Sequence, residues 1–212
     1  KVFNWLATLY RSRIRFTSPM IYAFSFLILF SIGGLTGIFL GAIGTDIHLH
    51  DTYFIVAHFH FTMMGGTVIA FLGGLHYWWP KFFGRLFNEK AARILAIAIM
   101  IGFLLTFIPQ FISGLHGMPR RYFMYVPKYT FTNQLSTIGA MILGFSILFS
   151  FINLFLGAVK GKPAGNNPWG VLGLEWTVTS PPDQHNFYEI PVIEHGPYDY
   201  DTVPVQSTAE IL

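Results

Sequence analysis

Two histidines, His58 and His60, stand two residues apart inside a long uncharged apolar stretch, and His50 and Asp51 stand where that stretch begins. Ionisable side chains at membrane depth are costly to bury, so they mark functional sites. Each residue of a helix turns by about 100°, so His58 and His60 point about 200° apart. They cannot chelate one small metal ion together, and we expect each histidine to serve its own site.

Axial ligation of haem iron suits an imidazole in a dry helical bundle. Two haems on opposite sides of one helix, with Phe59 between their ligands, would suit electron transfer between them. The adjacent Arg120 and Arg121 can hold haem propionates through charge-assisted, bidentate contacts. His50 and Asp51 offer one nitrogen and one hard oxygen to a divalent ion that keeps its waters, such as Mg²⁺.

Simpler interpretations of the same residues stay open. The two histidines of the apolar stretch can be core side chains that are hydrogen-bonded within the bundle. Arg120 and Arg121 can be a plain cationic pair at the membrane rim. Asp51 can cap the helix that follows it, a role compatible with metal binding. His76 lies beside two tryptophans, and we expect it to be an interfacial ring and not a ligand.

The elements that carry these residues are predicted to be membrane helices. The chain has 212 residues, of which 53% are hydrophobic and 11% are charged, and a soluble domain averages about 25% charged residues. We therefore predict an all-α membrane protein with a transmembrane bundle over residues 1–159 and a linker and tail over 160–212. Full spans are expected at about 18–44, 52–79, 94–115 and 134–159, with the end of a fifth span at 1–10.

The distribution of charge predicts the orientation of the spans. Nine basic residues are expected at one membrane face, and only Arg120, Arg121 and Lys128 at the other. The face richer in Lys and Arg lies in the cytoplasm or matrix. The tail is then inside, and the His–Asp pair shares the outer rim with the arginine pair. Basic residues at span ends indicate topology and not nucleic-acid binding.

Cysteine is absent from the sequence, which excludes disulfides and thiolate metal sites within this chain. No signal peptide is recognisable. The sequence opens at Lys1, directly in an apolar amphipathic run. We expect the chain to begin inside a helix, as a fragment, a split subunit or part of a longer chain.

The chain resembles the C-terminal half of subunit I of the haem–copper terminal oxidases, cytochrome c oxidase above all. The matching segments follow the family order over about residues 1–182, and the string at 50–60 is the most specific of them. They are KVFNW at 1–5, GGLTG at 33–37, HDTYFIVAHFH at 50–60, GLHGMPRRY at 114–122, LEW at 174–176 and SPP at 180–182.

The resemblance implies catalytic roles. His58 would be the proximal ligand of the high-spin haem at which O₂ binds. His60 would be one of two axial ligands of the low-spin haem, with Phe59 between the two sites. Lys1 would belong to a proton-uptake path, which agrees with the ease with which a membrane lysine shifts its pKa.

The resemblance also implies roles at the outer rim. His50 and Asp51 would bind Mg²⁺ or Mn²⁺ near the copper domain of a partner subunit. Arg120 and Arg121 would hold haem propionates, with Asp46 nearby.

A complete subunit of this family would have about twelve spans. The second low-spin haem ligand, the three histidines of the copper CuB and a cross-linked tyrosine would lie in earlier helices, outside this chain. The resemblance implies two haems, expected to be of haem a type. The implied partners are the N-terminal part of subunit I, subunits II and III, cytochrome c as electron donor and membrane lipids, with no nucleic acid.

We therefore expect part of a proton-pumping cytochrome c oxidase that reduces O₂ to water. A quinol oxidase of the same family is an alternative, and nitric oxide reductase fits less well. A non-catalytic haem-binding electron-transfer anchor and a transporter without haem are alternatives of other classes. The expected location is the bacterial plasma membrane, with the mitochondrial inner membrane as the alternative.

Overall fold

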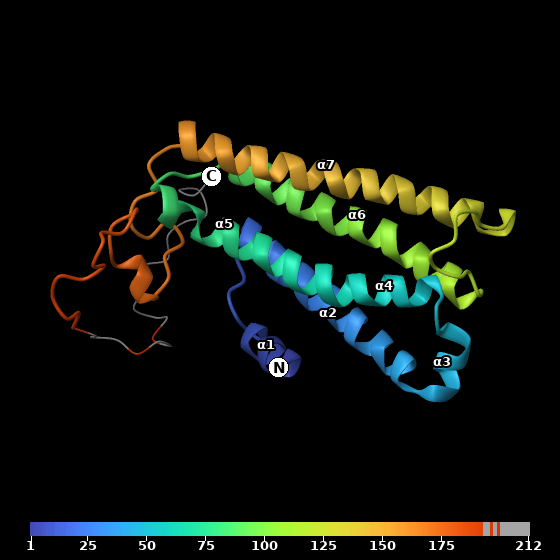
Figure 1. Ribbon diagram of the computed structural model, residues 1–212. Coiled ribbons are helices and arrows are strands. Elements are labelled where there is room, and N and C mark those ends of the chain that lie inside the picture. Colours follow the sequence, from blue (N-terminus) through green and yellow to red (C-terminus); the bar gives the residue numbers. More distant parts are fainter. Residues whose placement is uncertain (193–195, 197–198, 200–212) are drawn as a thin grey trace.

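The computed structural model describes residues 1–192, 196 and 199, and this part of the chain is helical with no β-strand (Figure 1). The described residues form seven α-helices, one π-helix and two 3₁₀ turns. In chain order they are α1 (Val2–Leu9), α2 (Ser18–Gly41), α3 (Ile43–Leu49), α4 (Tyr53–Thr62), the π-helix η1 (Met63–Val68), α5 (Ile69–Phe83), α6 (Glu89–Leu115), the 3₁₀ turn η2 (Pro127–Tyr129), α7 (Thr130–Lys160) and the 3₁₀ turn η3 (Leu174–Trp176).

Four helical runs are long and apolar enough to cross a membrane, since a span needs roughly 20 residues. They are Ser18–Gly41, Tyr53–Phe83, Glu89–Leu115 and Pro127–Lys160. The predicted all-α membrane class is confirmed. The stretch predicted to end a fifth span forms the short helix α1, which packs on α2 through Trp5 and Phe26, whose ring centroids are 5.3 Å apart.

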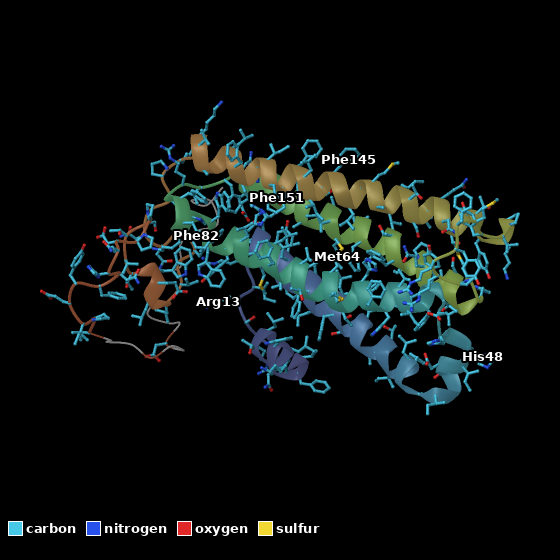
Figure 2. All side chains as sticks on the ribbon, in the orientation of Figure 1. Arg13, His48, Met64, Phe82, Phe145 and Phe151 are labelled. Carbon is cyan, nitrogen blue, oxygen red and sulfur yellow. The ribbon has the colours of Figure 1, made fainter. Side chains whose placement is uncertain are left out.

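The spans join at two ends, which we call the α3 end and the tail end. Tyr53 donates its backbone N–H to Met118 at the α3 end, and Leu86 donates to Lys162 at the tail end. Figure 2 shows Met64 midway along the bundle, with His48 at the α3 end and Phe82 at the tail end. Successive spans therefore run antiparallel to one another. The residues predicted to lie at the outer rim gather at the α3 end.

The loop between the second and third spans is shorter than the sequence suggested. Helix α5 continues through Pro80 to Phe83, because a proline inside a helix removes only one N–H donor and need not end the helix where packing supports it. Gly84 then ends α5 in the left-handed conformation, with φ of 65°. Asn88 starts α6 by accepting the Ala91 N–H at 3.1 Å on its side-chain oxygen.

The core of the bundle is aromatic and lies between α4 and α6. Phe61 is fully buried and meets Phe103 edge-on, with centroids 4.9 Å apart, and Phe54 meets Phe111 at 4.8 Å. Gly114 of α6 permits this contact, because a Cβ at that position would overlap the backbone nitrogen of Phe54. Small residues allow membrane helices to approach closely, so this glycine brings the start of α4 directly against the end of α6.

His76 is not interfacial, as its tryptophan neighbours suggested, but fully buried. Its Nδ1 lies 2.7 Å from the carbonyl of Leu72, and its Nε2 lies 3.2 Å from the hydroxyl of Ser150 on α7. The ring of Tyr22 on α2 packs against it at 4.9 Å. The expectation was wrong because the helix places His76 toward α2 and α7, and the two adjacent tryptophans take other directions.

The described part of the predicted tail is held against the tail end of the bundle. Lys81 is 5% exposed, and its Nζ donates to the carbonyls of Asn166 at 3.1 Å, Val178 at 2.8 Å and Thr179 at 3.3 Å. Trp176 donates its indole N–H to the hydroxyl of Tyr77 at 3.0 Å. The rest of the predicted tail, at 193–195, 197–198 and 200–212, lies outside the described residues.

Candidate functional site

The ring of His58 faces α2. Its Nδ1 lies 3.1 Å from the hydroxyl oxygen of Thr36, and that hydroxyl donates to the carbonyl of Gly33 at 2.9 Å. A threonine hydroxyl has one proton, which it can give either to the Gly33 carbonyl or to Nδ1 of His58. With that proton on the carbonyl, Nδ1 of His58 donates to the hydroxyl and Nε2 keeps a free lone pair.

The ring of His60 faces α6 and stacks on Phe107, with centroids 4.3 Å apart and planes at 20°. The ring of Phe59 also stacks against His60, with centroids 4.5 Å apart. The Nδ1 of His60 lies 2.8 Å from the carbonyl of Val56, which can only accept. Nδ1 therefore carries the proton here too, and the Nε2 lone pair is free.

The two histidines thus differ from His76 in one decisive respect. His76 has hydrogen-bond partners on both ring nitrogens, as a core histidine should. Within the described part of the chain, neither His58 nor His60 has a hydrogen bond at Nε2, and both side chains are only partly buried. An oriented imidazole with Nδ1 satisfied and Nε2 free is the arrangement of a metal ligand.

Gly37 supports the ring of His58, a contact that the sequence interpretation missed. A Cβ at Gly37 would lie 3.0 Å from Cε1 and 3.6 Å from Nε2 of the ring. The imidazole therefore lies directly against the backbone of α2. The glycines at 33–37 are visible in the sequence, but no local pattern there links Gly37 to a histidine 21 residues later. Gly33 serves close packing, because it faces the backbone of Phe61 and Thr62.

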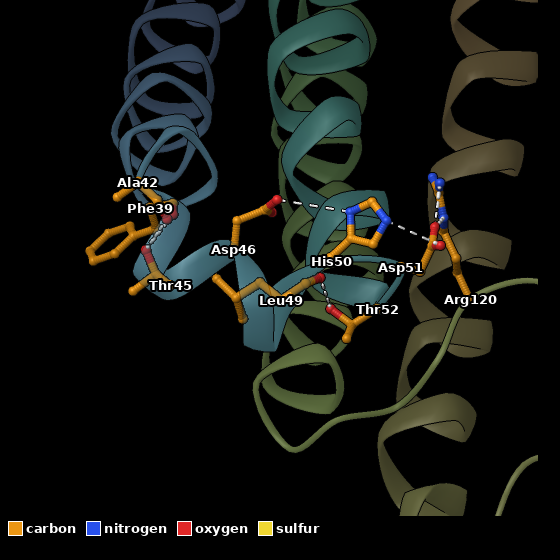
Figure 3. Close-up of polar contacts among 9 residues, drawn as sticks. All are labelled: Phe39, Ala42, Thr45, Asp46, Leu49, His50, Asp51, Thr52 and Arg120. Atoms are coloured by element: carbon orange, nitrogen blue, oxygen red, sulfur yellow. Dashed lines mark hydrogen bonds and ion pairs between the residues drawn. The ribbon is translucent and has the colours of Figure 1, made fainter.

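The outer-rim residues form a chain of polar contacts at the α3 end (Figure 3). Arg120 donates to Oδ1 of Asp51 from Nε at 2.8 Å and from Nη2 at 2.7 Å. His50 lies between two carboxylates, with Nε2 3.4 Å from Asp51 Oδ2 and Nδ1 3.8 Å from Asp46 Oδ2. The hydrogen bonds and charge of Arg120 hold the pKa of Asp51 below its usual value.

The backbone conformation at Asp51 positions its side chain at the outer rim. Asp51 adopts a left-handed conformation with φ of 55°, and its carbonyl accepts the Arg120 N–H at 2.9 Å. The helix cap that we considered for Asp51 belongs to Thr52, whose hydroxyl accepts the Phe54 N–H at 3.2 Å. Asp51 is thereby left free to pair across the rim with a residue of the loop after α6.

The remaining predicted residues stand apart from these contacts. Arg121 is exposed, with φ of 65°, and Lys1 is exposed at the start of α1. Among the described residues, no group of three or more His, Cys, Asp or Glu side chains is placed to hold a metal ion. His50 and Asp51 therefore supply two ligands at most, and the Mg²⁺ or Mn²⁺ site stays a prediction.

Comparison with known proteins identifies the family. The family model described as Cytochrome C and Quinol oxidase polypeptide I matches residues 1–142. The chain belongs to the subunit I family of the haem–copper oxidases. This confirms the resemblance that the motifs at 33–37, 50–60 and 114–122 indicated.

Similar proteins agree with the family assignment. The chain is 46% identical over 200 residues to cytochrome c oxidase subunit 1 of Thermostichus vulcanus, covering 94% of this chain and 36% of that protein. It is 44% identical over 193 residues to the heme-copper oxidase subunit I+III of Aeropyrum pernix, covering 91% of this chain and 23% of that protein. The chain thus spans about a third or less of the length of these relatives.

A solved structure of a heme-copper terminal oxidase dimer shares the fold. The match has a TM-score of 0.62 and 26% sequence identity, and it covers 68% of this chain and 27% of that chain. The family implies haem and copper as cofactors and partner subunits around subunit I. It also places the four apolar spans in a membrane.

Proposed function

We propose that this chain is the C-terminal part of the catalytic subunit of a proton-pumping cytochrome c oxidase that reduces O₂ to water. The observation that carries the proposal is the pair of free Nε2 atoms on His58 and His60. Each Nδ1 is hydrogen-bonded, and the two rings face different helices, α2 and α6. The names of the relatives support cytochrome c oxidase as the activity.

The residues around both rings fit haem ligands. His58 would hold the iron of the high-spin haem, and His60 would be one axial ligand of the low-spin haem. Phe59 and Phe107 stack against His60, with ring centroids 4.5 and 4.3 Å away, and these contacts limit rotation of its ring. Haem iron supplies the electron transfer and the O₂ chemistry, and this chain supplies ligands, orientation and a dry surrounding.

Arg120 at the α3 end can bind a haem propionate if it contacts Asp51 and the propionate at the same time. Its Nε and Nη2 contact only Oδ1 of Asp51, and a guanidinium has five N–H donors. Arg120 can therefore keep Asp51 and still donate to a propionate from its other edge. Arg121 is exposed beside it and can take a second carboxylate.

His50 and Asp51 are the candidate ligands of Mg²⁺ or Mn²⁺. Their Nε2 and Oδ2 atoms are 3.4 Å apart, which suits two neighbouring ligands of one octahedral ion at about 2.1 Å. Asp46 lies on the other side of His50 and would orient its ring. Waters or a partner subunit would complete the coordination.

The complete enzyme would need parts beyond this chain. We propose that the N-terminal helices supply the second low-spin ligand and CuB, and that subunits II and III complete the complex. Cytochrome c would be the electron donor, the haems would be of haem a type, and Lys1 would belong to a proton-uptake path. The relatives in bacteria support a bacterial plasma membrane.

Optical spectra of the purified oxidase test the ligand assignment. His60→Ala should remove the low-spin haem absorbance, and His58→Ala should mainly remove CO binding at the high-spin haem. His116→Ala is the control, because His116 is exposed at the end of α6 and its ring bonds only the carbonyl of Ile112 in that helix. Normal spectra in both site variants would show that the assignment is wrong.

Quinol oxidase is the second candidate, because the matching family description includes quinol oxidases. Turnover of the purified complex with reduced cytochrome c, compared with turnover with a quinol, separates the two. Oxidation of quinol without oxidation of cytochrome c would favour the second candidate and leave the haem ligands unchanged.

A further inference from the structure

We propose that the junction between α1 and α2 is a binding site for one anionic phospholipid of the membrane. Arg11, Arg13 and Arg15 would bind the phosphate of the headgroup, and the groove between α1 and α2 would hold an acyl chain. The site lies apart from the histidines and from the α3 end, so the proposal does not rest on the haem ligands.

Three arginines stand at alternate positions in the segment that joins α1 to α2, and Figure 2 shows Arg13 there. Arg11 and Arg13 are exposed, and Arg15 is partly buried. In the part of the chain that the structure describes, none of the three forms an ion pair with a carboxylate. Their charges are therefore available to an anion, and guanidinium groups suit phosphate because they donate two parallel hydrogen bonds.

The junction lies at the tail end of the bundle. Ser18, the first residue of α2, donates its backbone N–H and its hydroxyl to the carboxylate of Glu89 at 2.6 and 2.7 Å, and Glu89 begins α6 at that end. We expect the tail end at the cytoplasmic or matrix face, because it is the face richer in basic residues. Anionic lipids give the cytoplasmic leaflet a negative surface. The charge and the location of the arginines therefore match an anionic headgroup.

An apolar groove of about 350 Å³ lies beside the arginines, between α1 and the first turns of α2. Trp5 and Leu9 line it from α1, and Ala23 and Leu27 line it from α2. Among the described lining residues only Thr8 carries a hydroxyl, which donates within its own helix at 2.9 Å. Arginines at a span end serve topology by themselves, but an apolar groove beside them adds a place for a hydrocarbon chain.

The dimensions of the groove favour an acyl chain as its occupant. From Ser18 to Leu27, α2 rises by about 14 Å at about 1.5 Å per residue, and half of a hydrocarbon core is about 15 Å thick. A volume of 350 Å³ over this length leaves a width of about 5 Å, whereas a helix with its side chains is about 10–12 Å across. The groove therefore spans one leaflet and is too narrow for a helix of a partner polypeptide.

The residue between the groove and the arginines also suits a phospholipid. Tyr10 follows Leu9 of the groove and precedes Arg11, and its side chain is 71% exposed. Tyrosine is enriched at the level of the headgroups, where its apolar ring and its hydroxyl face different surroundings. The acyl chain, the interface and the phosphate thus find suitable residues in the order that a phospholipid requires.

Native mass spectrometry of the purified, complete oxidase in detergent micelles with phosphatidylglycerol or phosphatidylcholine tests the headgroup part. The native complex should retain phosphatidylglycerol in preference. Joint replacement by Arg11→Gln, Arg13→Gln and Arg15→Gln should lower its retention about tenfold or more, because each basic residue near the surface attracts anionic lipid. Retention of phosphatidylcholine should stay the same.

The matched control removes three positive charges elsewhere at the tail end. Lys90→Gln, Lys160→Gln and Lys162→Gln together change exposed residues, and this variant should retain phosphatidylglycerol as the native complex does. An equal loss in both triple variants, or no loss in the arginine variant, would overturn the site.

Filling the groove tests the acyl-chain part. Ala23→Trp should release phosphatidylglycerol although all three arginines are present. Ala140→Trp is the control, because Ala140 is an exposed alanine of α7 outside the groove. Full retention in Ala23→Trp would show that the groove does not hold the lipid.

A cross-link identifies the occupant directly, even if the triple variant fails to assemble. The chain has no cysteine, so Ala23→Cys gives it a single thiol for a photoactivatable maleimide. The expected product is this chain joined to phosphatidylglycerol, and a product joined to another polypeptide of the complex would overturn the proposal. Haem absorbance is recorded for every variant, so that loss of lipid with normal spectra is distinguished from failure of the haem assignment.

Discussion

Arg120 holds Asp51 by a single carboxylate oxygen, since its Nε and Nη2 both lie within 2.8 Å of Oδ1. The second oxygen, Oδ2, faces Nε2 of His50 at 3.4 Å. Two residues separated by 69 positions in the chain thus share one charge pair at the α3 end. The pairing leaves one carboxylate oxygen and one edge of the guanidinium for other partners.

The Arg120–Asp51 pair should make the stability of the oxidase depend on acid pH. The folded pKa of Asp51 is lowered, mainly by its hydrogen bonds to Arg120. The stabilisation is therefore fully present above the ordinary carboxyl pKa of about 4 and is lost as the pH falls through the lowered value. Thermal unfolding midpoints measured across this range should fall more for the native chain than for Asp51→Asn, and parallel profiles would contradict the pairing.

Gly37→Ala should disturb the site of His58 and spare that of His60. The added Cβ would stand 3.0 Å from Cε1 of His58, so the ring must move by a few tenths of an ångström. We expect an altered CO-difference spectrum with normal low-spin absorbance. Gly34→Ala is the matched control, because nothing lies within 4 Å of its Cβ position. Equal effects of both changes would mean that the contact with the ring is not the cause.

Gly114→Ala should destabilise the whole α3 end. The new Cβ would overlap the backbone nitrogen of Phe54 and lie 2.6 Å from its Cα, and backbone cannot move aside as a side chain can. We expect a loss of about 3 kcal/mol, seen as a lower midpoint in detergent denaturation. Gly144→Ala on α7 should cost nothing, because its Cβ position is open.

Lys81→Met should loosen the tail without altering the haems. It removes three hydrogen bonds to the carbonyls of Asn166, Val178 and Thr179, and a cation–π contact with Trp176 at 5.1 Å. Limited proteolysis should cut the segment after Lys162 faster than in the native chain. The control is Lys90→Met, at an exposed position, in which the tail should be cut at the native rate. A native rate of cutting in Lys81→Met would mean that other contacts hold the tail.

Local regularities were readable from the sequence. Runs of apolar residues predicted four membrane helices, because a span needs a fixed length of apolar chain in lipid. Helix ends were predicted less well, since the gap between the spans predicted at 52–79 and 94–115 narrows to the residues 84–88 between α5 and α6. The π-helix η1, directly after the two histidines, had no signal that we recognised. These misses have one reason, which is that packing extends or distorts helices beyond their intrinsic preferences.

The sequence by itself determined that His58 and His60 point in different directions, because helical geometry is local and repeats with every residue. It also indicated the family, through motifs that are each a short continuous segment of the chain. Only the tertiary structure decided that Thr36 and Gly37 receive His58, that Asp51 pairs with Arg120, and that His76 is buried with both nitrogens bonded. These contacts join different helices, so they depend on how the helices pack, and no local pattern in the chain specifies that.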